Sequence, residues 1–242
     1  MKLTYLILAL ILCTGCSSNK KVVKTDGSKF SRIIFKKQLV VTERGIDNFN
    51  KKVASLLPKV QMDSLVPKAE YDSITHSPKF KKMMSDFHRK SLMESPPSET
   101  VIEIINDSIW RHERQNGKII GDYYLIKKED AFLYYYNKSR SINYKKYDLL
   151  EAKDNYKIIR NESDRKFIKG FNCFRMTLIK EIKTLGLGNT IYDMYVTKEI
   201  DLPAHSVLNL SKLIPGYFPL EIKIRSEKLP GLVEDYVLTK IE

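Results

Sequence analysis

The sequence predicts an α+β fold in which one antiparallel β-sheet carries a helical insertion after its first strand. Three observations predict this fold. Residues 30–42 are rich in β-branched and aromatic residues, residues 47–94 place apolar side chains at helical spacing, and short β-type runs separated by polar turns follow from residue 101. The length after residue 30 fits one large domain, so we expect residues 30–242 to fold as a single unit.

The first 15 residues have the pattern of a bacterial signal peptide. Lys2 supplies a positive charge, residues 3–12 are mostly apolar, and Thr14 and Gly15 are small residues before the expected cleavage point. The apolar run is shorter than the roughly 20 residues that a membrane-spanning helix needs. We therefore expect residues 1–15 to be removed.

Residues 12–18 resemble the bacterial lipobox, in which a cysteine follows small residues and becomes the acylated first residue of the mature chain. Cys16 has that place here, whereas Cys13 stands where the pattern prefers leucine. The resemblance implies lipidation of Cys16, with residues 16–29 as a flexible tether. We expect the chain to be lipid-anchored in the envelope of a diderm bacterium, at the outer membrane facing the periplasm.

The helical insertion is expected to contain two helices. Apolar residues at helical spacing before Pro58 predict the first of them. The second has Ser77 as its N-cap and Pro78 at its first helical position. Its outer side is basic, and its apolar stripe consists of Phe80, Met83, Met84 and Phe87.

Two interpretations of this stripe stay open. An apolar stripe at this spacing usually packs on a sheet as part of the core, and this interpretation is favoured. The other interpretation is an adaptable Phe and Met surface that covers a ligand groove or contacts a membrane.

Successive hairpins are expected after residue 100, because strand-like runs alternate with short polar turns such as Asn116-Gly117. The predicted strands cover residues 101–105, 108–114, 122–127, 131–136, 141–144, 156–160, 173–182, 191–197, the alternating region around Ile222 and Ile224, and 235–241. Tyrosines are concentrated between residues 123 and 147. Tyr134 and Tyr136 are two residues apart, so in a strand they lie on the same face of the sheet. Such rings either stabilise the sheet as cross-strand pairs or line a ligand site, and the structural role is favoured.

Residues 166–173, 192–200 and 214–222 together resemble exported proteins of the GLPGLI type, in which an I-x-G-Y-x-C strand precedes a W/Y-x-T-x-E-I strand and a Pro-Gly loop. Phe171 replaces the usual tyrosine and Tyr195 the frequent tryptophan. These families look like relatives of the LolA/LolB lipoprotein carriers. The resemblance implies a curved half-barrel sheet closed by helices over an apolar cavity, and it transfers no catalytic residue.

Composition bears on partners and chemistry. The formal charge is +13, and the basic residues are spread along the chain, so anionic envelope components suit this surface better than nucleic acid does. The four histidines form no H-x-x-x-H or H-E-x-x-H pair, so we expect no metal and no cofactor. Cys173 lies in an apolar strand-like context and is expected to be a buried structural thiol.

These observations predict a non-catalytic envelope lipoprotein that binds or carries an apolar or amphiphilic ligand, such as a lipid or a lipoprotein acyl chain. The side chains expected to contact the ligand are Phe80, Met83, Met84, Phe87, Tyr134 and Tyr136. The alternative is a structural or assembly lipoprotein that binds a protein partner in the envelope through its sheet edge or its basic helix.

Overall fold

A computed structural model describes residues 29–56, 73–74, 76–106, 108–127, 132–136, 142–148, 155–181, 188–207 and 210–242. The predicted signal peptide, Cys16 and nearly all of the predicted tether lie outside the described residues. The elements, in chain order, are β1 (Arg32–Val41), α2 (Glu43–Leu56), α4 (Pro78–Met93), β2 (Ser98–Ile105), β3 (Ser108–Gln115), β4 (Lys118–Lys127), β5 (Phe132–Tyr136), β6 (Ile142–Asp148), β7 (Tyr156–Ile168), β8 (Phe171–Lys180), β9 (Thr190–Thr197), α5 (Leu210–Leu213), β10 (Phe218–Ser226) and β11 (Leu232–Ile241).

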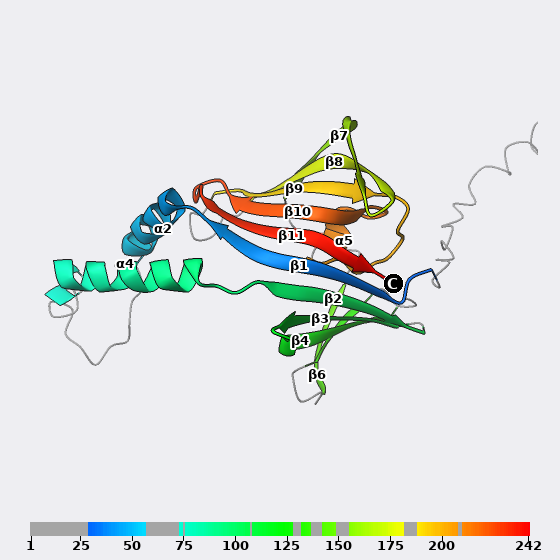
Figure 1. Ribbon diagram of the computed structural model, residues 1–242, viewed down its shortest axis with the longest axis horizontal. Coiled ribbons are helices and arrows are strands. Elements are labelled where there is room, and N and C mark those ends of the chain that lie inside the picture. Colours follow the sequence, from blue (N-terminus) through cyan, green and yellow to red (C-terminus); the bar gives the residue numbers. More distant parts are fainter. Residues whose placement is uncertain are drawn as a thin grey trace, which may run out of the picture.

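The strands form one antiparallel sheet in the order β6-β5-β4-β3-β2-β1-β11-β10-β9-β8-β7 (Figure 1). Strands β2 to β6 form one meander, and strands β7 to β11 form a second. The first strand, β1, lies between the meanders and pairs with both β2 and β11. The antiparallel sheet with a helical segment after its first strand is therefore confirmed.

The turn between β3 and β4 shows how local sequence sets the hairpins. Asn116 and Gly117 both have positive φ angles, of 50° and 73°. Two consecutive residues with positive φ are the requirement of the tight hairpin turn whose twist matches that of the flanking strands. The hairpin predicted from this dipeptide is confirmed.

Several strands are longer than predicted, and β7 differs most. Alternation predicts a strand only over residues 156–160, but β7 continues to Ile168. The pairing register shifts between Asn161 and Arg165. A bulge of this kind interrupts the two-residue alternation, which is why periodicity ends the predicted strand too early.

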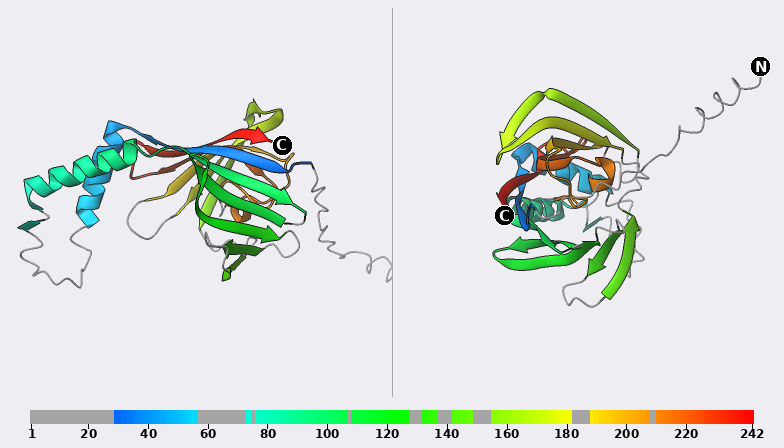
Figure 2. Two further views of the ribbon diagram at one scale, coloured as in Figure 1. Left: turned by 60° about the horizontal axis from the view of Figure 1, so that its bottom comes forward. Right: turned by 90° about the vertical axis from the view of Figure 1, so that its right-hand side faces the viewer.

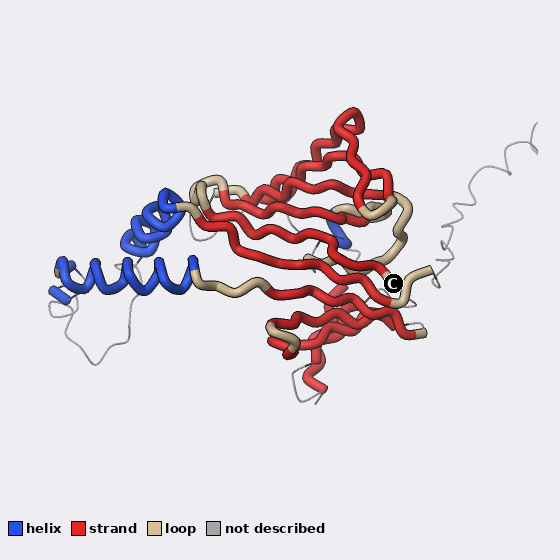
Figure 3. The backbone as a smooth tube through the Cα atoms, viewed as in Figure 1, coloured by secondary structure: helices blue, strands red, loops and turns tan. Residues whose placement is uncertain are grey.

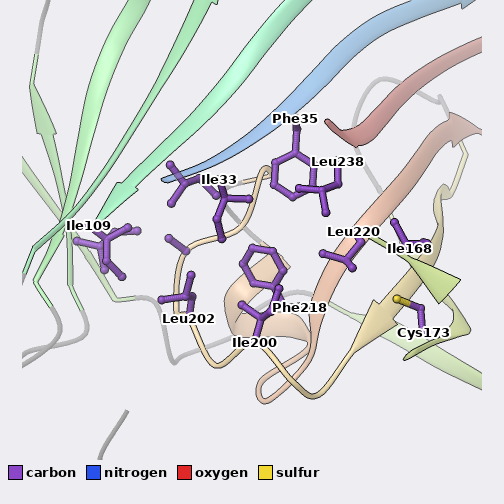
Figure 4. Close-up of a cluster of buried hydrophobic side chains, with 13 residues drawn as sticks. Ile33, Phe35, Ile109, Ile168, Cys173, Ile200, Leu202, Phe218, Leu220 and Leu238 are labelled. Carbon is purple, nitrogen blue, oxygen red and sulfur yellow. The ribbon is translucent and has the colours of Figure 1, made fainter. Parts of the chain in front are cut away.

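The sheet curves around the connection between β9 and β10, residues 198–217, which contains α5 (Figure 2). Ile200 and Leu202 of this connection are buried beside Phe218 of β10 (Figure 4). The Phe218 ring lies 6.2 Å from the ring of Phe35 on the central strand β1. Farther along the connection, Leu210, Leu213 and Ile214 pack with apolar residues of β8 to β11. The concave face is thus filled largely by the chain's own β9–β10 connection.

Helices α2 and α4 do not cover the sheet. Helices α2 and α4 project beyond the end of the sheet at which β1 finishes, and they form an arm (Figures 1 and 3). No residue of α4 is buried. The favoured interpretation, in which the stripe of Phe80, Met83, Met84 and Phe87 packs on the sheet, is therefore wrong for this fold. The β9–β10 connection already occupies the concave face where such a helix would lie.

Close backbone contact fixes the base of the arm. Thr42 caps α2, because its Oγ1 accepts a hydrogen bond from the Gly45 backbone N–H at 3.1 Å. The backbone N–H of Thr42 donates to the Gly231 carbonyl at 2.9 Å. Asn48 Nδ2 donates to the Pro230 carbonyl at 3.1 Å. The turn before β11 therefore sets the direction in which α2 leaves the sheet.

Gly231→Ala is expected to destabilise the protein by about 3 kcal/mol, because alanine here meets both strain and overlap. Gly231 has a φ of 96°, and an added Cβ would lie 2.4 Å from Thr42 Oγ1 and 2.7 Å from the Gly45 Cα. Gly117→Ala is the control, since its φ is 73° but the space around it is open. That change is expected to cost only about 1 kcal/mol. Urea unfolding of both variants measures the difference, and equal losses would contradict the contact at the arm base.

Candidate functional site

A partly open pocket of about 310 Å³ lies where β3 and β4 face β11 and the β9–β10 connection. Its wall combines aliphatic side chains, tyrosine rings and one ion pair. The lining residues are Arg111, Glu113, Ile120, Gly121, Tyr124, Val207 and Tyr236. The volume is at the lower end of the roughly 300–1,000 Å³ typical of small-molecule sites.

Arg111 is the central polar residue of the pocket. Its side chain is 6% exposed, and its Nε and Nη2 donate to the Ser206 carbonyl at 3.1 and 2.6 Å. Nη2 also lies 3.2 Å from a Glu113 carboxylate oxygen. The guanidinium carbon is 5.5 Å from the centre of the Tyr124 ring. Such contacts hold the guanidinium in one orientation in the pocket wall, joining the sheet to the β9–β10 connection.

Tyr236 also lines the pocket, and a second ion pair, between Lys37 and Glu234, lies beside its ring. Its ring is buried, its hydroxyl donates to a Glu234 carboxylate oxygen at 3.1 Å, and the Lys37 Nζ lies 5.5 Å from the ring centre. Burial, and next the negative charge of Glu234, raise the pKa of Tyr236, so the phenol stays protonated at neutral pH. Lys37 also lies 3.9 Å from Glu113 and 4.0 Å from Glu234. The charges around the pocket are therefore paired across three strands.

The arrangement suits an amphiphilic molecule. Ile120, Val207 and the faces of the two tyrosines offer apolar contact for a hydrocarbon body. Nε and Nη2 of Arg111 make the hydrogen bonds to Ser206 and Glu113, and the third guanidinium nitrogen is Nη1. Guanidinium donors match carboxylate and phosphate oxygens.

Of the six side chains expected to contact a ligand, the four on α4 are not among the described residues that line this pocket. Phe80, Met83, Met84 and Phe87 lie on the arm, with Met83 56% and Phe87 62% exposed. Tyr134 and Tyr136 lie on β5 opposite Leu125 and Tyr123 of β4, but the structure does not describe their side chains. A ligand role for these six residues stays a prediction.

Sequence reasoning missed most of the pocket residues. Arg111 gives a usable signal, because it takes an inward position two residues after the buried Ile109 on β3, where alternation calls for an apolar residue. Tyr124 belongs to the tyrosine-rich region singled out from the sequence. Val207 and Tyr236 give no signal, since only the folded chain brings the β9–β10 connection and β11 to β4.

Cys173 is confirmed as a buried thiol. It is fully buried and packs in the core with Ile168, Phe218 and Leu220. Burial raises the pKa of its thiol to about 11, with smaller contributions from Glu199 and Glu221. A thiol in this state is a poor nucleophile at neutral pH.

The sheet edge at β7 has features that oppose the addition of another strand. Phe167 is 76% exposed there, but the strand also carries the bulge between Asn161 and Arg165 and a series of charged side chains. Bulges and charges are the usual protections of an edge strand. A protein partner at this edge therefore has less support than a ligand in the pocket.

The comparisons with known proteins give no relative from which to transfer a function. No protein-family model matches the chain, and a search of curated proteins finds no match. Among the described residues, no group of three or more His, Cys, Asp and Glu side chains could hold a metal ion. In the same part of the chain, no helix combines the length and apolar character needed to cross a bilayer.

Proposed function

We propose that this chain is a lipid-anchored envelope protein that binds an amphiphilic ligand in the pocket of β3, β4 and β11, without catalysing a reaction on it. The observation that carries the proposal is the pocket itself, where a largely buried guanidinium stands beside aliphatic and tyrosine side chains. The apolar body of the ligand contacts Ile120, Val207 and the tyrosine rings. Its polar end accepts from Arg111.

The attachment to the membrane belongs to the same proposal. The signal-peptide pattern of residues 1–15 and the lipobox around Cys16 support export followed by acylation. Acyl chains bury hydrocarbon in the bilayer at about 0.8 kcal/mol per methylene, so more than one chain anchors a protein durably. An amphiphile-binding protein held at the outer membrane has its ligand source in the adjacent lipid.

The test is native mass spectrometry of the chain from Ser17 onward, which contains every described strand and helix. The protein is expressed in a lipid-containing host and purified without detergent. We expect a co-purifying amphiphile whose mass does not change on incubation with the protein. An apo mass that takes up none of the lipids offered would refute the proposal, and conversion of the bound mass would indicate an enzyme.

Ile120→Trp is expected to remove most of the bound mass, because the larger ring fills space in the pocket. Ile119→Trp is the matched control. Ile119 is the neighbouring residue on β4, is 37% exposed and, by strand alternation, lies on the other face of the sheet. Retention of the ligand by both variants would place it elsewhere in the protein.

A further inference from the structure

Helix α4 presents an apolar stripe that no described residue buries. Met83 and Phe87 are 56% and 62% exposed, and Phe80 is half-buried. These three residues follow the i, i+3, i+7 spacing that aligns side chains along one side of a helix. We call Phe80, Met83 and Phe87 the arm stripe.

The opposite side of α4 is the one that packs on α2. Asn50 Nδ2 donates to Ser85 Oγ at 2.8 Å, and Asn50 Oδ1 lies 2.7 Å from His88 Nδ1. The His88 ring is 5.0 Å from the Phe49 ring, and Arg89 bonds Glu43 at 2.5 Å. At 100° per residue, these contacts turn the arm stripe away from α2.

Basic side chains are frequent on α4, and two of them lie beside the arm stripe. Asp86 is the single acidic residue of Pro78–Met93, against the basic residues Lys79, Lys81, Lys82, Arg89 and Lys90. Among the described residues, no carboxylate lies within ion-pair distance of Lys79, Lys82 or Lys90. At 100° per residue, Lys79 and Lys90 lie along one side of the arm stripe, so positive charge borders the apolar line there.

We propose that the arm stripe is a contact site for the surface of a membrane rich in anionic phospholipid. Phe and Met enter the boundary between head groups and acyl chains, while the lysine stems extend toward lipid phosphates. Each lysine near an anionic surface adds attraction that salt screens.

The geometry favours a membrane over a protein partner. A standard protein interface buries about 800 Å² on each side, and the arm stripe offers only three apolar side chains. Membrane affinity grows with the apolar area buried and with attraction to anionic lipid, which the flanking lysines add. The arm projects past the end of the sheet (Figure 1). A flat membrane can therefore reach the arm without a clash with the sheet. It lies at the end of β1 opposite the N-terminal residues of the described chain, and so gives a second attachment point distinct from the predicted lipid at Cys16. This proposal does not depend on a ligand in the pocket.

The experiment measures co-sedimentation of the unacylated chain from Ser17 onward with vesicles of phosphatidylglycerol and phosphatidylcholine, and with vesicles of phosphatidylcholine alone. We expect binding to the anionic vesicles that weakens as salt is raised. A variant with Lys79→Glu, Lys82→Glu and Lys90→Glu is expected to bind about 100-fold more weakly. Its matched control carries Lys157→Glu, Lys223→Glu and Lys228→Glu, three exposed lysines of the sheet and its turns, and makes the same change in net charge.

A second pair of variants tests the apolar part. Met83→Ser with Phe87→Ser is expected to weaken binding at least about tenfold, because both side chains enter the bilayer boundary. Phe167→Ser is the control, since Phe167 is 76% exposed on β7, away from the arm. Unchanged binding by both arm variants, or an equal loss in the control variants, would overturn the proposal. Absence of vesicle binding by the wild-type chain, with a protein cross-linked to residue 83 in cells, would assign the face to a protein partner instead.

Discussion

Replacement of Phe218 by alanine is expected to lower the free energy of unfolding by about 3 to 5 kcal/mol. Phe218 is fully buried where the sheet meets the β9–β10 connection, with its ring 6.2 Å from Phe35 and 5.3 Å from His205. Truncation removes contacts to both and leaves a cavity that the surrounding strands cannot close. Urea or thermal unfolding of the variant and the wild type measures the loss.

Phe167→Ala is the control for this prediction. It deletes the same ring, but from a side chain that is 76% exposed on the edge strand β7. We expect a change within about 0.5 kcal/mol, as is usual for exposed sites. Similar losses in both variants would show that the β9–β10 connection does not pack on the sheet through Phe218.

The protein is expected to lose stability as the pH falls from about 7 to about 5, with His205 responsible for about 2 kcal/mol. His205 is buried, and its burial lowers the pKa of the imidazole to about 3. Below its ordinary pKa of 6.5, the unfolded chain binds a proton at this residue that the folded chain does not. The contribution of His205 is therefore complete above pH 6.5 and decreases steadily as the pH falls toward 3.

His205→Leu isolates this contribution, because other titrating groups act equally in both proteins. The variant is expected to show a flatter dependence of unfolding free energy on pH in this range. Unfolding in urea at several pH values measures the two slopes. Parallel slopes for the wild type and His205→Leu would mean that His205 becomes protonated without unfolding, and that the β9–β10 connection opens to water.

The two proposals make separable predictions about lipid. Under the first proposal the pocket binds single molecules and depends on Ile120. Under the second the arm stripe binds a surface and depends on Phe87 and the lysines near it. Ile120→Trp is therefore expected to leave vesicle binding unchanged, and the arm variants are expected to retain the co-purified amphiphile. Loss of both properties in one variant would indicate that the two regions form a single lipid site.

Local structure could be predicted from the sequence where neighbouring residues determine it. Asn116-Gly117 gives the hairpin turn of β3 and β4 because both residues tolerate positive φ. Ser77 caps α4, accepting from the Phe80 backbone N–H at 3.2 Å, and Pro78 starts the helix. These features depend on contacts within a few residues, which a single sequence records.

The candidate site could be predicted only in part. The tyrosine-rich region includes Tyr124, which lines the pocket, and the exposed stripe on α4 combines apolar and basic residues. The favoured placement of that stripe in the core was wrong because it assumed that helices close the sheet. The β9–β10 connection takes this position, and its apolar residues, such as Ile200 and Leu202, have no periodicity that marks them as core.

The strand-forming runs, the turn and cap residues and the amphipathic character of α4 can be read from the sequence, as can the pattern around Cys16 that resembles a lipobox. The pairing of β1 with β11, the contacts of Arg111 with the Ser206 carbonyl and Glu113, and the projection of α2 and α4 as an arm become visible only in the folded protein. The physical reason is the range of the interactions. Hairpins and caps are closed by near neighbours, whereas the contact of Gly45 with Gly231 that directs the arm exists only once strands from both ends of the chain lie side by side.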